Sequence, residues 1–529
     1  MKKLSSNLFV LLLLAVISPF FVQAEGLDFI VGPAKNELDI AGGETKSIEI
    51  LITNRLGVNE NFSISLSSLE TDKLGNLTVS EKSNSLNVSV PEKININSGA
   101  SKTINVKVSV PKNHEPGSVA FGVFVEPKKS AVNELTSHSR IGVINIVKIS
   151  GEVKESGLFE KLSISDKKIV RMDDTAPLSL DFSNTGNVHL NPYGIVIIQN
   201  VFGKEVHAQK IDPWYVMPNS SRTREISLST TNFFGRYTAT VILNRGYGDQ
   251  VDSKTVAFYV VPFFVPLVLA IILVGLIFFF IKRGFLNGVL VAGILLAGVV
   301  NVHAQMSSTN YKVQFDSVNV GGGLSSSTNY RQESTVGEIA TGEISSANYN
   351  IHAGYQQMNE VYLAITNAAD VNLTPNLGSV SGGTANGSTN ITVTTDGSAG
   401  YSLYVNASTS PALASGTDSF ADYAPSGANP DFSFSFLASQ SFFGFSPEGT
   451  DVVAQFLDNG ASCGVGATDT SDSCWDGFAT TTEKISEKTS ANTPAGTATS
   501  LKLRAGAGAS RNQQAGNYEA DITFTALAL

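Results

Sequence analysis

The sequence predicts a mainly all-β protein whose two exported parts are separated by a pair of membrane-length apolar segments. Short alternating runs of apolar and polar residues, rich in β-branched side chains, recur through residues 25–259 and 361–529. Gly, Pro and Asn separate these runs and helical periodicity is absent, which is typical of β-sandwiches. Between the two parts, residues 260–281 and 285–304 are each long enough for a membrane helix.

Residues 1–24 predict a secretory signal peptide. Lys2 and Lys3 precede an apolar run that ends in small residues at Val22-Gln23-Ala24. A basic start, an apolar middle and a small-x-small end are the pattern of such a peptide, with cleavage after Ala24. We therefore expect the part that follows to lie outside the cytoplasm.

The first exported part is long enough for two immunoglobulin-like β-sandwiches, at residues 25–151 and 152–259. Strands are predicted by alternation and β-branched content at Ser47–Thr53, Thr103–Val110 and Val119–Val125. Trp214 beside Tyr215 is the best candidate for an exposed, sugar-stacking aromatic residue. The alternative is a side chain buried in the sandwich.

The apolar segments set the expected topology. Residues 260–281 carry no charge and predict a transmembrane helix, and Lys282 and Arg283 form a basic cytoplasmic turn at residues 282–284. Residues 285–304 predict either a second transmembrane helix or an internal signal peptide cut after Ala304. A third interpretation is that two adjacent reading frames were joined. Both large parts are expected outside the cell membrane, and cleavage would release the second to the cell wall.

A repeat opens the second part, in residues 305–360. A five-residue motif recurs at an interval of 19, at Ser307–Tyr311, Ser326–Tyr330 and Ser345–Tyr349. Fixed spacing favours a stalk or small β element, each unit being a turn that enters a short strand; a polar linker is the alternative. Residues 361–529 predict a β-sandwich-like domain, with strands at residues 391–395 and 402–405.

Composition narrows the classes of partner. Charged residues are 16% of the chain, and residues 305–529 carry 7 basic and 20 acidic side chains. Such an acidic part argues against a nucleic-acid partner, because phosphate binding needs clustered cations. The two cysteines, Cys463 and Cys474, predict a disulfide in an exported domain. A metal site is the weaker alternative, since no His lies near them.

We find no catalytic constellation, cofactor motif or metal site in the sequence. The six His residues are scattered, and Gly-x-Ser-x-Gly and phosphate-loop motifs are absent. Asp469, Asp472 and Asp476 do not have EF-hand spacing, so a solvated loop is favoured over a Ca²⁺ site. An enzyme is therefore not expected, and a glycan hydrolase with a paired-carboxylate cleft is the most distant alternative.

Ordered motifs in the first part carry a family resemblance. The motifs are Ile30-Val31-Gly32-Pro33, Gly42-Gly43-Glu44-Thr45, Phe182-Ser183-Asn184-Thr185-Gly186-Asn187 and Phe234-Gly235-Arg236-Tyr237. By these motifs in this order, residues 25–283 resemble the WxL-interacting proteins, in which two β domains precede one membrane helix. The resemblance implies binding of peptidoglycan by the first domain and of other surface ligands by the second.

Two segments of the second part, Gly400-Tyr401-Ser402-Leu403 and residues 516–524, carry a second resemblance. They are similar to the first and second signatures of the WxL domain, a module that attaches non-covalently to the cell wall. Tyr401 and Phe524 occupy the positions of the family's two Trp residues. Stacking on glycan is implied, and the alternative is a role in the core. The candidate wall-binding residues are Tyr401, Leu403, Tyr518, Ile522, Phe524 and Trp214.

The sequence thus predicts a membrane-anchored surface protein that associates non-covalently with peptidoglycan or another wall polymer. Contact between the two halves, or with other WxL-type proteins, is expected because the two family partners occur in one chain. The alternative function is a structural subunit of a surface fibre or layer without glycan affinity.

Overall fold

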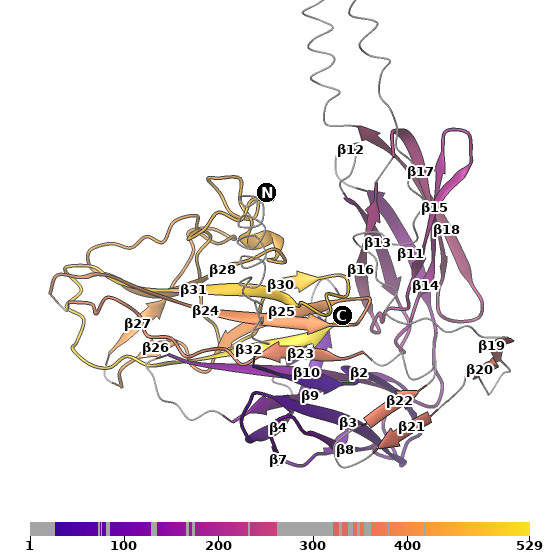
Figure 1. Ribbon diagram of the computed structural model, residues 1–529, viewed down its shortest axis with the longest axis horizontal. Helices are drawn as coiled ribbons and strands as arrows, with labels where there is room; N and C mark the ends of the chain where they lie inside the picture. The colour runs from indigo at the N-terminus through magenta and orange to yellow at the C-terminus, as the bar shows by residue number, and fades with distance from the viewer. Residues whose placement is uncertain are drawn as a thin grey trace, which may run out of the picture.

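The mainly all-β prediction is confirmed by the computed structural model of the chain (Figure 1). The described residues form β-strands and a single 3₁₀ helix, η2 (Ala454–Phe456). The structure describes residues 27–71, 75, 77–80, 85–128, 135–164, 169–171, 175–230, 233–261, 321–326, 331–336, 342–345, 350–353, 361–378, 380–416 and 418–529.

Most of the predicted membrane region lies outside the described residues. This applies to the signal peptide with Ala24, to Lys282 and Arg283, and to residues 285–304 with Ala304. The predicted start of the first membrane helix at residue 260 is wrong, because Val260 belongs to a strand and is buried in a sandwich core. Within the described ranges, no helix has the length and apolar character to span a bilayer.

The first sandwich is built from ten strands. In Thr45–Arg55, for example, Ile48, Ile50 and Ile52 alternate with exposed or half-buried residues and point inward, as the two-residue period of a strand requires. The strands are β1 (Asp28–Gly32), β2 (Lys35–Ile40), β3 (Thr45–Arg55), β4 (Glu60–Thr71), β5 (Leu77–Ser80), β6 (Asn87–Ser89), β7 (Lys93–Ile96), β8 (Ser101–Ser109), β9 (Gly117–Pro127) and β10 (Leu135–Ile149).

The second sandwich has a core of its own, in which Trp214, Phe182 and Phe258 are buried. A three-stranded sheet, β11-β13-β16, packs on a five-stranded sheet, β12-β18-β17-β14-β15. Its strands are β11 (Gly157–Ile164), β12 (Ile169–Arg171), β13 (Thr175–Asn184), β14 (Tyr193–Asn200), β15 (Glu205–Ile211), β16 (Ser220–Ser229), β17 (Gly235–Asn244) and β18 (Val251–Val261).

The repeat region contributes two short antiparallel hairpins. β19 (Gly321–Ser326) pairs with β20 (Arg331–Val336), and β21 (Gly342–Ser345) pairs with β22 (Asn350–Ala353). The second and third copies of the five-residue motif therefore begin at the last residue of one strand and occupy the connection to the next. The first copy, at residues 307–311, lies outside the described residues.

The second half forms a further sandwich that contains both predicted strands. Residues 391–395 lie at the end of β24, and residues 402–405 lie inside β25. Its strands are β23 (Leu363–Thr366), β24 (Gly383–Thr395), β25 (Tyr401–Ala407), β26 (Leu413–Ala414), β27 (Ser419–Asp422), β28 (Ser441–Glu448), β29 (Asp476–Gly477), β30 (Glu483–Lys488), β31 (Thr497–Ala507) and β32 (Ala520–Ala528).

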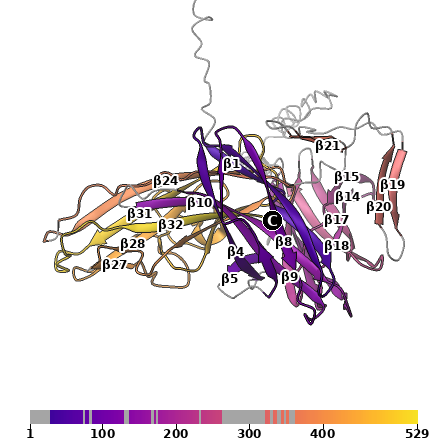
Figure 2. The same ribbon diagram turned by 90° about the horizontal axis from the view of Figure 1, so that it is seen from below.

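Two sheets run without a break from the first sandwich into the second half (Figures 1 and 2). In the larger sheet, β23 of the second half pairs with β1; in the smaller, β32 pairs with β10. A single hydrophobic core, which includes Val31, Ile141, Leu363 and Phe524, spans both halves. The sequence predicted separate modules, whereas these two share both sheets and core.

Candidate functional site: the strand shared by two sandwiches

β10 is a 15-residue strand that belongs to two sandwiches at once. Its first half, Leu135 to Gly142, pairs in parallel with β32 of the second half of the chain. Its second half, Val143 to Ile149, pairs antiparallel with β9 of its own sandwich. The strand thus passes from one sandwich into the other without a turn.

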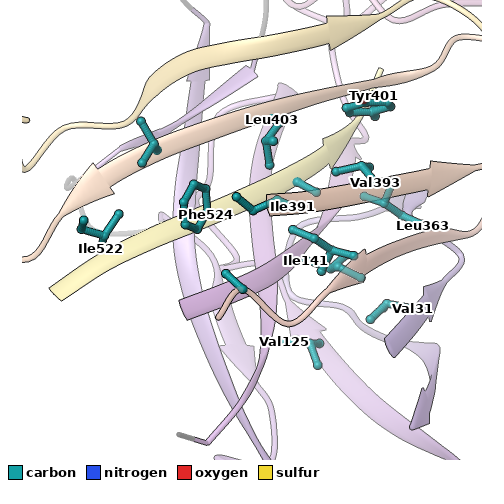
Figure 3. Close-up of a cluster of buried hydrophobic side chains, with 14 of the residues drawn as sticks. Val31, Val125, Ile141, Leu363, Ile391, Val393, Tyr401, Leu403, Ile522 and Phe524 are labelled. Carbon is teal, nitrogen blue, oxygen red and sulfur yellow. The ribbon is translucent and has the colours of Figure 1, made fainter. Parts of the chain in front are cut away.

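The second half supplies only three adjacent strands, β30-β25-β32, to one of its sheets, and β10 is the fourth strand beside them. Without it, β32 would be an edge strand with unpaired backbone groups, beside an uncovered core. Leu135 and Ile141 of β10 are fully buried. Figure 3 shows Ile141 among Leu363, Ile391 and Val393, side chains of β23 and β24. β10 therefore closes the core of the second half.

Polar contacts fix the position of β10 in the second half. The backbone N–H of Ala368 donates to Ser139 Oγ at 2.9 Å, and the N–H of Ser137 donates to Asp370 Oδ1 at 3.1 Å. Arg140 Nε donates to Thr525 Oγ1 of β32 at 2.6 Å. Since Ser137 and Ser139 are buried, these bonds specify the register of the strand.

A second seam runs through the other sheet. β1 pairs antiparallel with β23, with Val31 opposite Leu363. Beyond the ladder, the N–H of Ala34 donates to the carbonyl of Val361 at 2.6 Å. A Cβ at Gly32 would lie 2.2 Å from the ring of Tyr362. The close approach of the two halves therefore requires glycine at this position.

An ionic contact lies on the outer face of β10. His138 is 2.8 Å from Glu126 of β9 through Nδ1 and 3.1 Å from Asp521 of β32 through Nε2. Hydrogen bonding to Asp521 and then to Glu126 raises the pKa of His138 to about 9, against the opposing effect of burial. The imidazolium thus joins the first sandwich to the second half at neutral pH.

The second sandwich also contacts this region. Its Tyr215 and Met217 share a small apolar cluster with Phe124 of β9 and with Tyr404 and Leu527 of the second half. Arg224 Nη2 donates to the carbonyl of Ser398 at 3.5 Å. The two N-terminal sandwiches therefore both face the second half.

The candidate wall-binding residues lie mostly in cores, which favours the alternative role in the core over that of stacking platforms. Tyr401, Leu403, Ile522 and Phe524 are fully buried in the core shared by the two halves. Their alternating positions in β25 and β32 turn them inward, so that no aromatic face is open to a sugar.

Trp214 and Tyr518 are the two remaining candidate wall-binding residues. Trp214 is buried in the second sandwich, edge-on to Phe182 at a ring distance of 6.4 Å. Tyr518 is half-buried and donates through its hydroxyl to the carbonyl of Gln514 at 2.8 Å. Trp214 thus belongs to a different core from the other five candidates.

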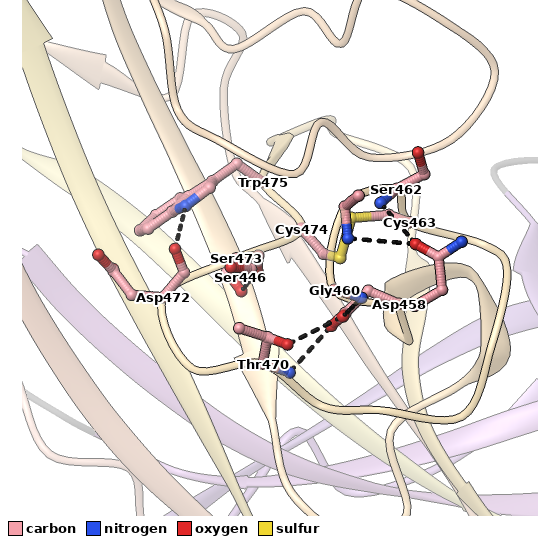
Figure 4. Close-up of a disulfide and its surroundings, with 12 residues drawn as sticks. Ser446, Asp458, Gly460, Ser462, Cys463, Thr470, Asp472, Ser473, Cys474 and Trp475 are labelled. Atoms are coloured by element: carbon pink, nitrogen blue, oxygen red, sulfur yellow. Dashed lines mark hydrogen bonds between the residues drawn. A yellow bond between two sulfur atoms is a disulfide. The ribbon is translucent and has the colours of Figure 1, made fainter.

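The predicted disulfide between Cys463 and Cys474 is present (Figure 4). Asp458 organises the loop around it, because the N–H groups of Gly460 and Thr470 donate to its carboxylate at 2.6 and 2.9 Å. Asp472 pairs with Arg504 at 2.7 Å. Among the described residues, no three acidic, His or Cys side chains gather as they would around a metal ion.

Comparisons with known proteins return structures but no sequence family. No family model matches the chain, and no curated protein matches it. A chaperone–tip adhesin complex of CFA/I fimbriae has 16% identity and a TM-score of 0.25, covering 43% of this chain and 97% of that one. A chaperone–tip subunit pre-assembly complex from the Csu pili of Acinetobacter baumannii has 14% identity and a TM-score of 0.25, covering 44% and 98%.

The chaperone of class 5 fimbriae gives similar values, with 16% identity, a TM-score of 0.23 and coverage of 44% and 98%. At these identities and TM-scores, the likenesses carry no conclusion about function. The pairing of the strands within this chain has to be interpreted by itself.

Sequence reasoning missed that β10 is shared by two sandwiches. Its one signal is an unusually long alternating run, in which Leu135, Ser137, Ser139 and Ile141 share one face. Two serines among four inward positions hide the apolar alternation by which strands are recognised.

Proposed function

We propose that the first half of the chain is a strand-donating chaperone for the second half, which is a surface subunit with an incomplete sandwich. The observation that carries this proposal is that β10 pairs in parallel with β32 while the same strand remains part of its own sandwich. This mode of recognition, the addition of a strand to an open sheet edge, takes affinity from main-chain hydrogen bonds and specificity from alternate side chains.

The energetics support a complex that is stable and still exchangeable. Burial of Leu135 and Ile141 contributes about 1.5–3 kcal/mol for each side chain. Parallel pairing is slightly less favourable than antiparallel pairing. A strand from another subunit that entered the same groove antiparallel to β32 would therefore compete with β10. Such exchange would link subunits and give the surface fibre that the sequence offers as its alternative function.

Association with peptidoglycan remains a sequence-based prediction. Because Tyr401, Leu403, Ile522 and Phe524 are buried, wall binding would have to use another surface of the second half. Strand donation needs no such surface, and it accounts for the tandem order of the two halves in one chain.

The test uses the full chain in mild detergent, with a protease recognition sequence inserted after Ala304. After cleavage, the two fragments are expected to elute together in size-exclusion chromatography. Ile141→Asp places a charge in the shared core and should release the second fragment as an aggregate. Ile242→Asp is the matched control, since Ile242 lies exposed on β17 of the second sandwich. Separation of the unmodified fragments, or co-elution with Ile141→Asp, would refute strand donation.

A further inference from the structure

Large apolar side chains are exposed together at one end of the second sandwich. The exposed fractions are 89% for Phe202, 68% for Phe234, 61% for Val201, 58% for Ile169 and 48% for Tyr259. Scattered exposed apolar residues are normal on proteins, whereas a group of them indicates a site of interaction. We call these five residues the apolar tip.

Strand registers place the apolar tip at a single end. Asn200, the last residue of β14, lies opposite Tyr237 near the start of β17, and Gly235 lies opposite Val260 near the end of β18. The turn that holds Val201 and Phe202 follows Asn200 directly, and Phe234 precedes Gly235. In β12 and β18, Ile169 and Tyr259 are direct partners.

The opposite end of this sandwich is the one that meets the rest of the protein. Asn184 lies there, bonded through its side-chain amide to the carbonyls of Val188 and Val216, beside the Tyr215 and Met217 that contact the second half. Figure 1 shows β12 at the end of the sandwich farthest from β10 and β32. The apolar tip is thus uncovered in the described part of the molecule.

The course of the chain indicates what covers the tip. β18 ends at Val261, beside Tyr259, and the sequence from Pro262 to Ile281 carries no charge. We propose that the apolar tip is a membrane-docking surface that inserts into the boundary between lipid headgroups and acyl chains. Aromatic side chains favour this boundary.

Charge at the tip fits an anionic lipid surface. Lys204 follows the turn of Phe202, and Arg236 lies directly opposite Tyr259 in the sheet; both are exposed. Glu205 is an exposed anion beside them, so the cations exceed the anions by one among these three. The second sandwich, whose eight-residue strand β14 is about 25 Å long, would then stand between the bilayer and the strand-donating site.

The test measures contact with lipid at single positions of the full chain reconstituted in vesicles. Both native cysteines are in the disulfide, so one introduced cysteine can carry a bimane fluorophore. Val201→Cys reports on the tip. Val251→Cys is the matched control, because Val251 is an equally exposed valine (56%) at the opposite end of the same sheet. The vesicles contain phosphatidylcholine and phosphatidylglycerol, with nitroxide-labelled acyl chains as quencher.

For docking, bimane at residue 201 should lose roughly half its fluorescence to the lipid quencher, while bimane at residue 251 is unaffected. Phe202→Ser with Phe234→Ser should abolish the quenching at residue 201 without moving the unfolding midpoint. The quenching at residue 201 should be weaker in vesicles of phosphatidylcholine alone, because these carry no anionic lipid. Equal quenching at both positions, none at either, or a blue shift at residue 201 without quenching, as in a protein contact, would each overturn the proposal.

Discussion

His138 Nε2 lies 3.1 Å from Asp521 Oδ1, so one ion pair joins β10 of the first half to β32 of the second. Glu126 contacts the other ring nitrogen, and Arg140, two residues along β10, donates to Thr525 rather than to either carboxylate. The charged His138 is therefore shared between the two parts of the chain that β10 joins.

Stability is expected to depend on pH through His138. Its pKa rises from 6.5 to about 9 on folding, so its contribution is complete below pH 6.5 and disappears as pH rises through 9. Between pH 6.5 and 10 the free energy of unfolding should fall by about 1–3 kcal/mol through this group. Thermal unfolding of the full chain over this range measures the effect.

His138→Ala should remove that pH dependence. His207→Ala in β15 of the second sandwich is the control and should preserve it. An equal fall of the unfolding midpoint in the His138→Ala chain would show that another group is responsible.

A side chain at Gly142 should disturb the contact between the halves. A Cβ there would lie 2.3 Å from Leu527 Cδ2 of β32 and 2.7 Å from Phe124 Cε1 of β9. Gly142→Val is expected to lower the free energy of unfolding by about 1–3 kcal/mol through overpacking, as measured by denaturant titration.

Leu527→Ala in the same chain should recover part of that loss, since it removes one of the two clashing groups. Gly427→Val serves as the control, because a Cβ at Gly427 meets no atom within 4 Å. Losses that simply add in the double variant would argue against the contact.

Phe524 is expected to act in the core rather than as a glycan platform. It is fully buried in the core common to both halves, so Phe524→Ala should cost about 3–5 kcal/mol of unfolding free energy. Phe524→Leu keeps most of the volume and should cost much less. A variant with unchanged thermal stability and reduced retention on peptidoglycan would restore the binding role.

Loss of the disulfide should weaken the second half together with the first sandwich, which shares its core, and leave the second sandwich unaffected. The loop between Cys463 and Cys474 spans 11 positions, and closing a loop of this length stabilises by about 2–3 kcal/mol in the chain-entropy description. In a Cys463→Ser, Cys474→Ser chain, the unfolding seen by Trp475 should shift, while that seen by Trp214 in the second sandwich should not. Dithiothreitol should shift the parent chain equally and leave the double variant unaffected.

Strand alternation was readable in the sequence, but the partners of the strands were not. Residues 391–395 and 402–405 were predicted as strands and lie in β24 and β25. The inward direction of Tyr401 and Phe524 follows from the same alternation, although their positions in the family signatures favoured a surface role. The outer boundary of the second sandwich shifted from residue 259 to Val261, because Val260 and Val261, which the sequence assigned to the start of the predicted apolar helix, belong to β18.

By itself, the sequence determined the all-β class and the pairing of Cys463 with Cys474. Each follows from local pattern or from two residues close in the chain. Only the tertiary structure decided that β10 completes the second half. Leu135 and Phe524 lie 389 positions apart in the sequence (524 − 135). The register between such distant strands depends on the fit of a shared core and on buried bonds such as that from Ala368 to Ser139.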